Sequence, residues 1–299
     1  PSKAPPAAAD APPPPPLGPL RPPGRGRQGL GSPLAERSRS ICTGLHIGID
    51  AVTFQMQYGN LKGISRVWME VIPELLRRLS GDPTDPLDSW GIGREMHCVT
   101  IFTRHYAGVP STLQRAIWEA QAEQSIQQHL DISLVEVPMY NENDDHGSDS
   151  TMLTLLCNYH AVDVFFSTQY TSLDPTFSYA KQVLVVHDLI PEIYAWETDK
   201  GFWDMKAKAI RQADAIVTVS NTTKTHLKEY YPEIKAPIYG SSNGLNLTVF
   251  KRASPEQIHN FTRTYGIPQP YILLVGSRFG YKNGMLLYEV MQQAAAGAG

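Results

Sequence analysis

The sequence is poor in the residues that mark secreted, metal-stapled or membrane-spanning chains. Only three cysteines occur among 299 residues, Cys42, Cys98 and Cys157, each in an apolar neighbourhood. Their odd number and wide separation favour buried thiols in a reducing compartment, and no CxxC or Cys/His spacing suggests zinc. Because there is no signal-peptide core and no apolar run of about 18 residues, we expect no membrane span and a cytoplasmic location. The net charge of -3 gives no case for nucleic-acid binding.

Aromatic residues are absent from residues 1–40, which hold 12 of the 24 prolines and six Lys or Arg against two Asp or Glu. A segment with so few large apolar groups cannot offset its ordering entropy, so we expect a disordered Pro-rich tail. Pro16 to Arg21 (Pro-Leu-Gly-Pro-Leu-Arg) matches a polyproline ligand and suggests an SH3-type partner. Low-complexity proline tracts also produce such matches freely.

Beyond the tail, short apolar runs alternate with helical periodicities. The first run, 45–50, precedes a stretch, 64–79, whose apolar residues step by three and one along one helix face that continues past Pro73. Further strands are expected at 97–103, 132–137, 163–166, 183–186 and 215–219, and further helices at 111–130, 150–160, 198–212 and 221–230. Strands separated by helices of this length predict an α/β fold with a doubly wound parallel sheet.

This rhythm breaks after residue 240, which predicts a domain boundary. We expect a Rossmann-like domain over 41–240 and a linker over 241–270 with a polar helix near Pro255. A new strand and helix over 271–299 would then begin a second domain. One βα unit is not a domain, so we expect the second domain to be truncated.

The most informative stretch is the run Val183 to Val186, which leads directly into His187 and Asp188 and soon reaches Pro191. Ligands in open α/β sheets bind just outside the carboxyl ends of the strands. A neutral imidazole there can hydrogen-bond a ligand or lend partial positive charge to a transition state, and a carboxylate can orient it. The alternative is a histidine packed in a loop, with Asp188 capping the turn. A metal-dependent His-Asp hydrolase would need further ligands that are absent.

Five short motifs occur in a fixed order along the chain. They are Gly63-Ile-Ser-Arg66, Phe166-Ser-Thr-Gln-Tyr-Thr171, His187-Asp-Leu-Ile-Pro-Glu192, Val219-Ser-Asn-Thr-Thr-Lys224 and Val275-Gly-Ser-Arg-Phe-Gly-Tyr-Lys-Asn283. In this order and spacing, over about residues 45 to 291, they resemble the retaining GT-B glycosyltransferases of the group-1/family-4 type. The resemblance implies two Rossmann-like domains that face each other across a cleft. The C-terminal domain would hold a nucleotide-sugar donor, and the N-terminal domain, present here, a carbohydrate or lipid-linked acceptor.

The resemblance also implies roles for single residues. Gly63 and Arg66 would border the donor phosphates at a helix N-terminus, although a glycine needed only for a turn is an equal reading. Lys62 stands where relatives often have a second glycine. Arg278 and Lys282 would clamp the donor diphosphate from two sides, and the alternative is a solvated basic loop.

The resemblance places His187 against the donor sugar, with Asp188 beside it, as the catalytic pair. Tyr170 would stack on or hydrogen-bond the acceptor, and it could equally be a loop aromatic. The acidic stretch with Asp144, Asp145, His146 and Asp149 offers a rival metal site but has no EF-hand spacing, so a solvated loop is the stronger reading.

These observations predict a hexosyltransferase that moves a sugar from a nucleotide-sugar donor to an acceptor hydroxyl with retention, without a cofactor or metal. Residues 1–299 are expected to be nearly inactive alone, because the acidic donor-binding segment of the family is missing from them. The alternative function is a non-catalytic binding or scaffolding remnant whose Pro-rich tail recruits a partner.

Overall fold

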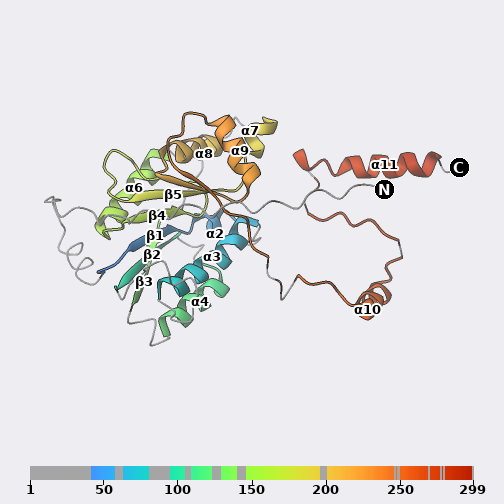
Figure 1. Cartoon of the computed structure of the whole chain (residues 1–299), viewed down its shortest axis with the longest axis horizontal. Helices are drawn as coiled ribbons and strands as arrows, with labels where there is room; N and C mark the ends of the chain where they lie inside the picture. Colours follow the sequence, from blue (N-terminus) through green and yellow to red (C-terminus); the bar gives the residue numbers. More distant parts are fainter. Residues whose placement is uncertain are drawn as a thin grey trace, which may run out of the picture.

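The computed structural model describes most of the chain beyond residue 41 (Figure 1). The described residues are 42–57, 63–80, 95–104, 109–122, 129–139, 146–195, 201–245, 247, 250–268, 270–276, 278 and 280–297. The predicted tail 1–40 with its Pro16 to Arg21 motif, together with Lys62, Asp144 and Asp145, lies outside the described residues.

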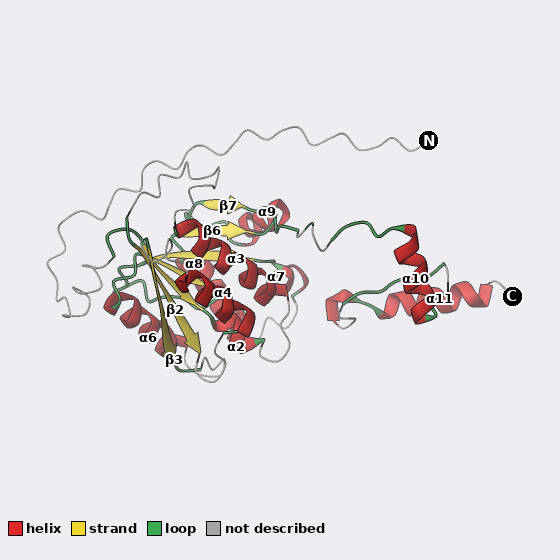
Figure 2. Ribbon diagram, turned by 90° about the horizontal axis from the view of Figure 1, so that it is seen from below, coloured by secondary structure: helices red, strands yellow, loops and turns green. Residues whose placement is uncertain are grey.

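The centre of the molecule is one sheet, seen with its flanking helices in Figure 2, and its seven strands have the order β3-β2-β1-β4-β5-β6-β7. The strands are β1 (His46–Asp50), β2 (His97–Arg104), β3 (Leu130–Val137), β4 (Val164–Ser167), β5 (Lys181–Val186), β6 (Ala215–Thr218) and β7 (Ile238–Gly240). Every neighbouring pair is parallel. The strand order departs from β1 in both directions, which creates a topological switch point between β1 and β4.

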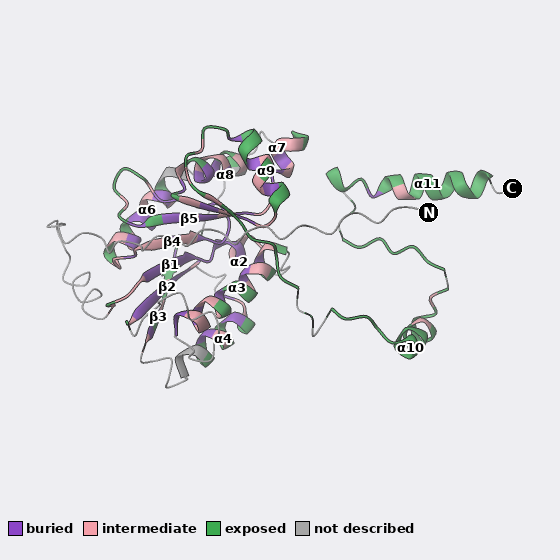
Figure 3. Cartoon of the chain, viewed as in Figure 1, coloured by how far each residue is buried: buried purple, intermediate pink, exposed green. Residues whose placement is uncertain are grey.

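Helices cover both faces of this sheet (Figure 3). They are α2 (Val52–Met56), α3 (Gly63–Leu79), α4 (Ser111–Ala122), α6 (His146–Tyr159), α7 (Ile190–Tyr194), α8 (Gly201–Gln212) and α9 (Asn221–Tyr230). Apolar residues of α3 and α4, among them Trp68 and Ile117, pack with Ile49 and Ile101 in one core cluster. A second cluster joins α6 to β2 and β4, and a third joins α8 and α9 to β5 and β6. The predicted doubly wound parallel α/β fold is confirmed.

The burial of each strand follows its place in the sheet. All five residues of the central strand β1 are buried, which explains why its sequence does not alternate. At the edge, β3 buries only Leu130, Ile132 and Val137, and its other residues are exposed or half-buried. The helix α3 shows the predicted apolar stripe, buries Trp68, Ile72, Leu76 and Leu79, and runs through Pro73 as one helix.

Several element boundaries differ from the sequence prediction. The helix predicted over 111–130 extends too far, because Leu130 already begins β3. In contrast, α6 begins at His146 instead of residue 150, so Asp149 lies in a helix and not in a solvated loop. The three-residue edge strand β7 was not predicted, since its short sequence carries no periodicity of its own.

Beyond β7 the described residues are mostly exposed. They form α10 (Pro255–Tyr265), which starts with a capping box of Ser254 and Gln257, the 3-10 turn η2 (Gly280–Lys282) and α11 (Met285–Gly297). The strand predicted at 271–276 is wrong for this structure: no strand lies beside this segment among the described residues, and Val275 is 79% exposed. The boundaries of the linker and second domain stay predictions. None of the described helices combines the length and apolar character needed to cross a membrane.

Candidate functional site

The carboxyl ends of β1, β2, β4 and β5 carry a group of polar and charged side chains. In a doubly wound sheet the helices that leave neighbouring strands on opposite faces open a crevice at this edge. Two buried cations lie here, Arg104 at the end of β2 and Lys206 on α8. Each organises a separate hydrogen-bond network, one at the switch point and one beneath the loop after β5.

The first network centres on Arg104, whose side chain is fully buried. Its guanidinium donates to both oxygens of Asp50, at 3.0 Å and 2.5 Å, and to Oδ1 of Asp149 at 2.6 Å. Thr171 donates its hydroxyl to Asp50 Oδ2 at 2.6 Å. Burial raises the pKa of Asp50, while Arg104 and the Thr171 hydroxyl act to lower it. This closed arrangement ties the end of β1 to β2, α6 and the loop after β4.

The loop after β4 is held against β1 by further hydrogen bonds. Thr168 donates its hydroxyl to the Asp50 carbonyl at 2.8 Å and accepts from the backbone N–H of Thr53 at 3.0 Å. Ser167 accepts from the backbone N–H groups of Gln169 and Thr171 at 3.2 Å and 3.0 Å. The polar residues of the motif 166–171 therefore serve to fix the switch-point loop.

His187 and Asp188 follow β5 directly, as the sequence predicts. The Nε2 atom of His187 is buried and has no hydrogen-bond partner among the described residues. Burial lowers the pKa of His187, and the nearby charge of Asp188 only partly opposes this. The imidazole is therefore neutral near pH 7, and the hydrogen-bonding capacity of its Nε2 is not used by the described residues.

Asp188 has a local structural role in the described chain. Its Oδ1 accepts from the backbone N–H of Ile190 at 3.2 Å, which caps the turn that leads into α7. This is the capping reading of Asp188 that the sequence left open, and it also fixes the chain next to His187. Pro191 occupies the first turn of α7, where a missing N–H costs nothing.

The second network supports the loop after β5 and centres on Lys206, whose side chain is fully buried. Its Nζ donates to the Asp188 carbonyl at 2.8 Å and to Glu192 Oε2 at 2.9 Å. The hydroxyl of Tyr231 donates to Glu192 Oε1 at 3.0 Å. The ammonium also lies 5.6 Å from the ring centroid of Tyr170, within cation-π range. Burial lowers the pKa of Lys206, and Glu192 raises it in opposition.

Tyr170 is close to the predicted pair but is not open to an acceptor. Its side chain is 3% exposed and packs in the core cluster with Leu184, Val186 and Leu189. Burial raises its pKa beyond the ordinary range of tyrosine. No ring face is available for stacking, so the structure favours the second of the two readings, a loop aromatic.

The predicted donor residues of the first helix occupy its exposed start. Gly63 begins α3, and an added Cβ there would meet nothing within 4 Å, so no close approach inside the protein requires glycine. Ser65 donates its hydroxyl to Gln57 Oε1 at 2.7 Å. Arg66 forms an ion pair with Glu70 at 2.9 Å, with both side chains more than 60% exposed.

Arg278 and Lys282 lie on the exposed segment around η2. The Arg278 carbonyl accepts from the backbone N–H of Gly284 at 3.0 Å, and the Lys282 ammonium lies 5.3 Å from the ring centroid of Tyr281. Tyr281 in turn stacks on Tyr194 of α7, with ring centroids 6.2 Å apart and planes at 18°. This aromatic contact places η2 beside the short helix that follows His187 and Asp188.

Three charged residues of these networks were missed by sequence reasoning. Asp50 ends one predicted strand and Arg104 directly follows another, so the rule that selected His187 would have found them too. Lys206 lies four residues from Ile210 on the face of α8 that faces the core, where a lysine demands a buried partner.

Proteins similar to this chain are found among solved structures. No family model matches the chain, and no curated protein does. Among solved structures, it is similar to Anabaena Alr3699/HepE in complex with UDP-glucose, at 12% identity and a TM-score of 0.42. It is also similar to the same protein with UDP and glucose, at 13% and 0.42, and with UDP, at 14% and 0.40. Each match covers 75% of this chain and 50% of the other, so the chain spans about half the length of these structures.

Proposed function

We propose that this chain belongs to a GT-B glycosyltransferase of the retaining group-1/family-4 type and supplies its acceptor-side domain and the start of its donor-side domain. The observation that carries the proposal is the neutral His187 at the carboxyl end of β5, whose buried Nε2 has no hydrogen-bond partner among the described residues. Asp188, Lys206 and Glu192 hold the loop that presents it. Four of the five ordered motifs lie on the doubly wound domain and the fifth on the segment around η2, and their order supports the same reaction class.

The proposed chemistry is transfer of a hexosyl group on one face of the donor. The acceptor oxygen bonds to the anomeric carbon while the bond from that carbon to the donor phosphate oxygen breaks. The hydroxyl proton passes to the departing phosphate oxygen, so atoms and charge balance without a redox partner. His187 contacts the sugar and stabilises the developing positive charge at the anomeric centre.

Arg278 and Lys282 neutralise the departing diphosphate in this proposal. A cation pair four residues apart can contact both phosphates, and such contacts strengthen as negative charge moves onto the leaving group. Gly63 and Arg66 approach the same phosphates from the start of α3, where the helix dipole adds positive potential. No metal or other cofactor takes part in this transfer.

Titration of nucleoside diphosphates against the chain tests the donor assignment. We expect UDP or GDP to bind, and the double variant Arg278→Ala/Lys282→Ala to lose at least about tenfold in affinity, since each lost charge-assisted hydrogen bond costs about 1.5–3 kcal/mol. The matched control is Lys251→Ala/Arg252→Ala, which removes two exposed cations from the preceding segment. Binding that both double variants weaken equally would refute a specific clamp, and no binding to the unaltered chain would refute the donor assignment.

A second experiment tests His187. Saturation-transfer NMR with a nucleotide sugar should show contact from the hexose protons to the unaltered chain, and His187→Ala should reduce the hexose signal while the base signal persists. A nucleotide sugar that contacts the protein through its base alone, in both proteins, would contradict the role of His187. The acceptor, a carbohydrate or lipid-linked hydroxyl in this proposal, can then be sought by competition with the hexose signal.

A further inference from the structure

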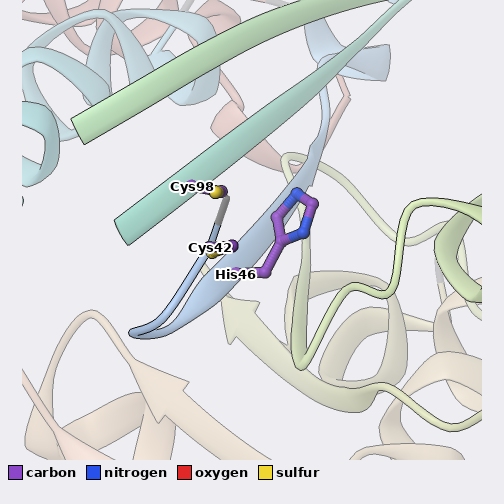
Figure 4. A group of neighbouring side chains, drawn as sticks. All are labelled: Cys42, His46 and Cys98. Atoms are coloured by element: carbon purple, nitrogen blue, oxygen red, sulfur yellow. The ribbon is translucent and has the colours of Figure 1, made fainter. Parts of the chain in front are cut away.

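The amino end of the sheet, opposite the proposed transfer site, carries a second cluster of chemically active side chains. Cys42 precedes β1, His46 begins it, and Cys98 is the second residue of β2. The two sulfur atoms and a ring nitrogen of His46 all lie within 4.8 Å of one another. Figure 4 shows the two sulfurs next to each other and the imidazole projecting from the adjoining strand. The parallel register, in which His46 pairs with Cys98, brings these distant sequence positions together.

The histidine of this cluster is buried and held in place by hydrogen bonds. Its Nε2 lies 2.8 Å from the hydroxyl of Thr100, and the backbone of His160 offers a second hydrogen bond to the ring. Whichever nitrogen binds a metal, the other N–H keeps an oxygen to donate to, an arrangement that orients metal-bound imidazoles.

Carboxylates surround the cluster and make it attractive to a cation. Asp163 Oδ2 accepts from the backbone N–H of His46 at 2.9 Å. Asp131 on β3 is the register partner of Cys98. The sulfur atoms themselves are soft donors, and a bound metal ion displaces their protons outright.

We propose that Cys42, His46 and Cys98 bind one thiophilic metal ion of the Zn²⁺ class, with water in the fourth position. Two thiols lose their protons on binding, so the ligand set contributes two negative charges that balance the ion. Cys98 and His46 are buried, whereas Cys42 is partly exposed and leaves an entry path. The ion fastens the segment before β1 onto β2, which gives it a structural role.

This site is independent of the proposed glycosyl transfer, because it lies at the other end of the strands. The absence of a Cys-x-x-Cys signal in the sequence has a simple cause: one of the ligands comes from a separate strand. Cys157, the third thiol, is buried in the core cluster around α6 and has no part in the site.

Metal analysis of the purified chain tests the proposal directly. After dialysis against metal-free buffer, elemental analysis should find about one zinc ion per chain. Replacement by Co²⁺ should produce thiolate-to-cobalt charge-transfer absorption, together with the visible bands of tetrahedral cobalt. Cys42→Ser should lose the ion and its charge-transfer band, and the zinc-dependent rise in Tm should vanish with it.

Two further variants separate the site from general damage to the fold. Cys157→Ser removes a buried thiol elsewhere and should keep one ion per chain. His46→Gln should weaken metal binding at least about tenfold, since even loss of a hydrogen-bond partner of a ligand costs about 10–100-fold. Cobalt binding that survives in Cys42→Ser would overturn the assignment. A metal-free chain whose mass is lower by two hydrogens, with Cys42 joined to Cys98, would overturn it too.

Discussion

Arg104 and Lys206 are both buried cations at the carboxyl edge of the sheet, but their surroundings differ. Arg104 is enclosed by two carboxylates, Asp50 and Asp149, which its planar fork contacts through several parallel hydrogen bonds. Lys206 has one carboxylate, Glu192, and otherwise a backbone carbonyl and aromatic rings. Arginine suits rigid bidentate pairing, whereas lysine is a point charge whose pKa shifts more readily.

This contrast separates the network that stabilises the fold from the one that supports the candidate site. The Arg104 network joins elements from four parts of the chain and leaves no oxygen of Asp50 unused. The Lys206 network ends in the carbonyl of Asp188, one residue after His187. Loss of Arg104 should therefore destabilise the whole domain, and loss of Lys206 should destabilise mainly the loop after β5.

The largest effect is expected for Arg104→Met. It leaves Asp50 buried without its partner, so the free energy of unfolding should fall by about 3–5 kcal/mol in urea titration. Arg104→Lys keeps the charge without the planar fork, so its free energy of unfolding should lie between those of Arg104→Met and the unaltered chain. The matched control is Arg115→Met, which removes an exposed pair with Glu119 and should cost less than about 0.5 kcal/mol. Equal losses of unfolding free energy in Arg104→Met and Arg115→Met would contradict a special role for Arg104.

A smaller loss, about 2–3 kcal/mol, is expected for Lys206→Met. Glu192 keeps the Tyr231 hydroxyl and is partly exposed, so its charge stays partly compensated. The double variant Lys206→Met/Glu192→Gln should recover part of the loss, since no unpaired charge is then buried. A double-mutant cycle in urea gives the coupling energy. Strict additivity would show that the ion pair carries no energy of its own.

The next effect is the pH dependence that His187 adds. Its pKa is lowered in the folded chain by burial, so the unfolded chain takes up a proton first as the pH falls. Stability from this residue is complete above about pH 6.5, the unfolded pKa, and is lost on descent toward the folded pKa. Urea titrations at several pH values in this window should show that the free energy of unfolding changes less steeply with pH in His187→Gln than in the unaltered chain. Part of the slope should persist, because burial lowers the pKa of His160 as well. An unchanged slope in His187→Gln would contradict the burial argument.

The sequence predicted the fold better than the site, for reasons visible in particular residues. Periodicity and short apolar runs report burial, which is why the strands up to β6 and the stripe of α3 were found. Asp149 was missed as an ion-pair partner because its role depends on Arg104, 45 residues away and on another element. Tyr170 was ambiguous for the same reason: only the packed neighbours of its ring show that no acceptor can reach it. The cluster of Cys42 and Cys98 likewise exists only through the register of two strands.

The smallest effect on stability, and the sharpest test of the donor side, comes from Arg66. Its ion pair with Glu70 is exposed, so Arg66→Ala should change the free energy of unfolding by no more than about 0.5 kcal/mol. Glu70→Ala breaks the same pair but keeps the cation, which makes it the matched control. If Arg66 contacts donor phosphate, Arg66→Ala should weaken nucleoside diphosphate binding by about tenfold, the value of one charge-assisted hydrogen bond, while Glu70→Ala should not weaken it. Equal affinities in the two variants would leave Arg66 as a surface residue of α3, and the clamp would then rest on Arg278 and Lys282.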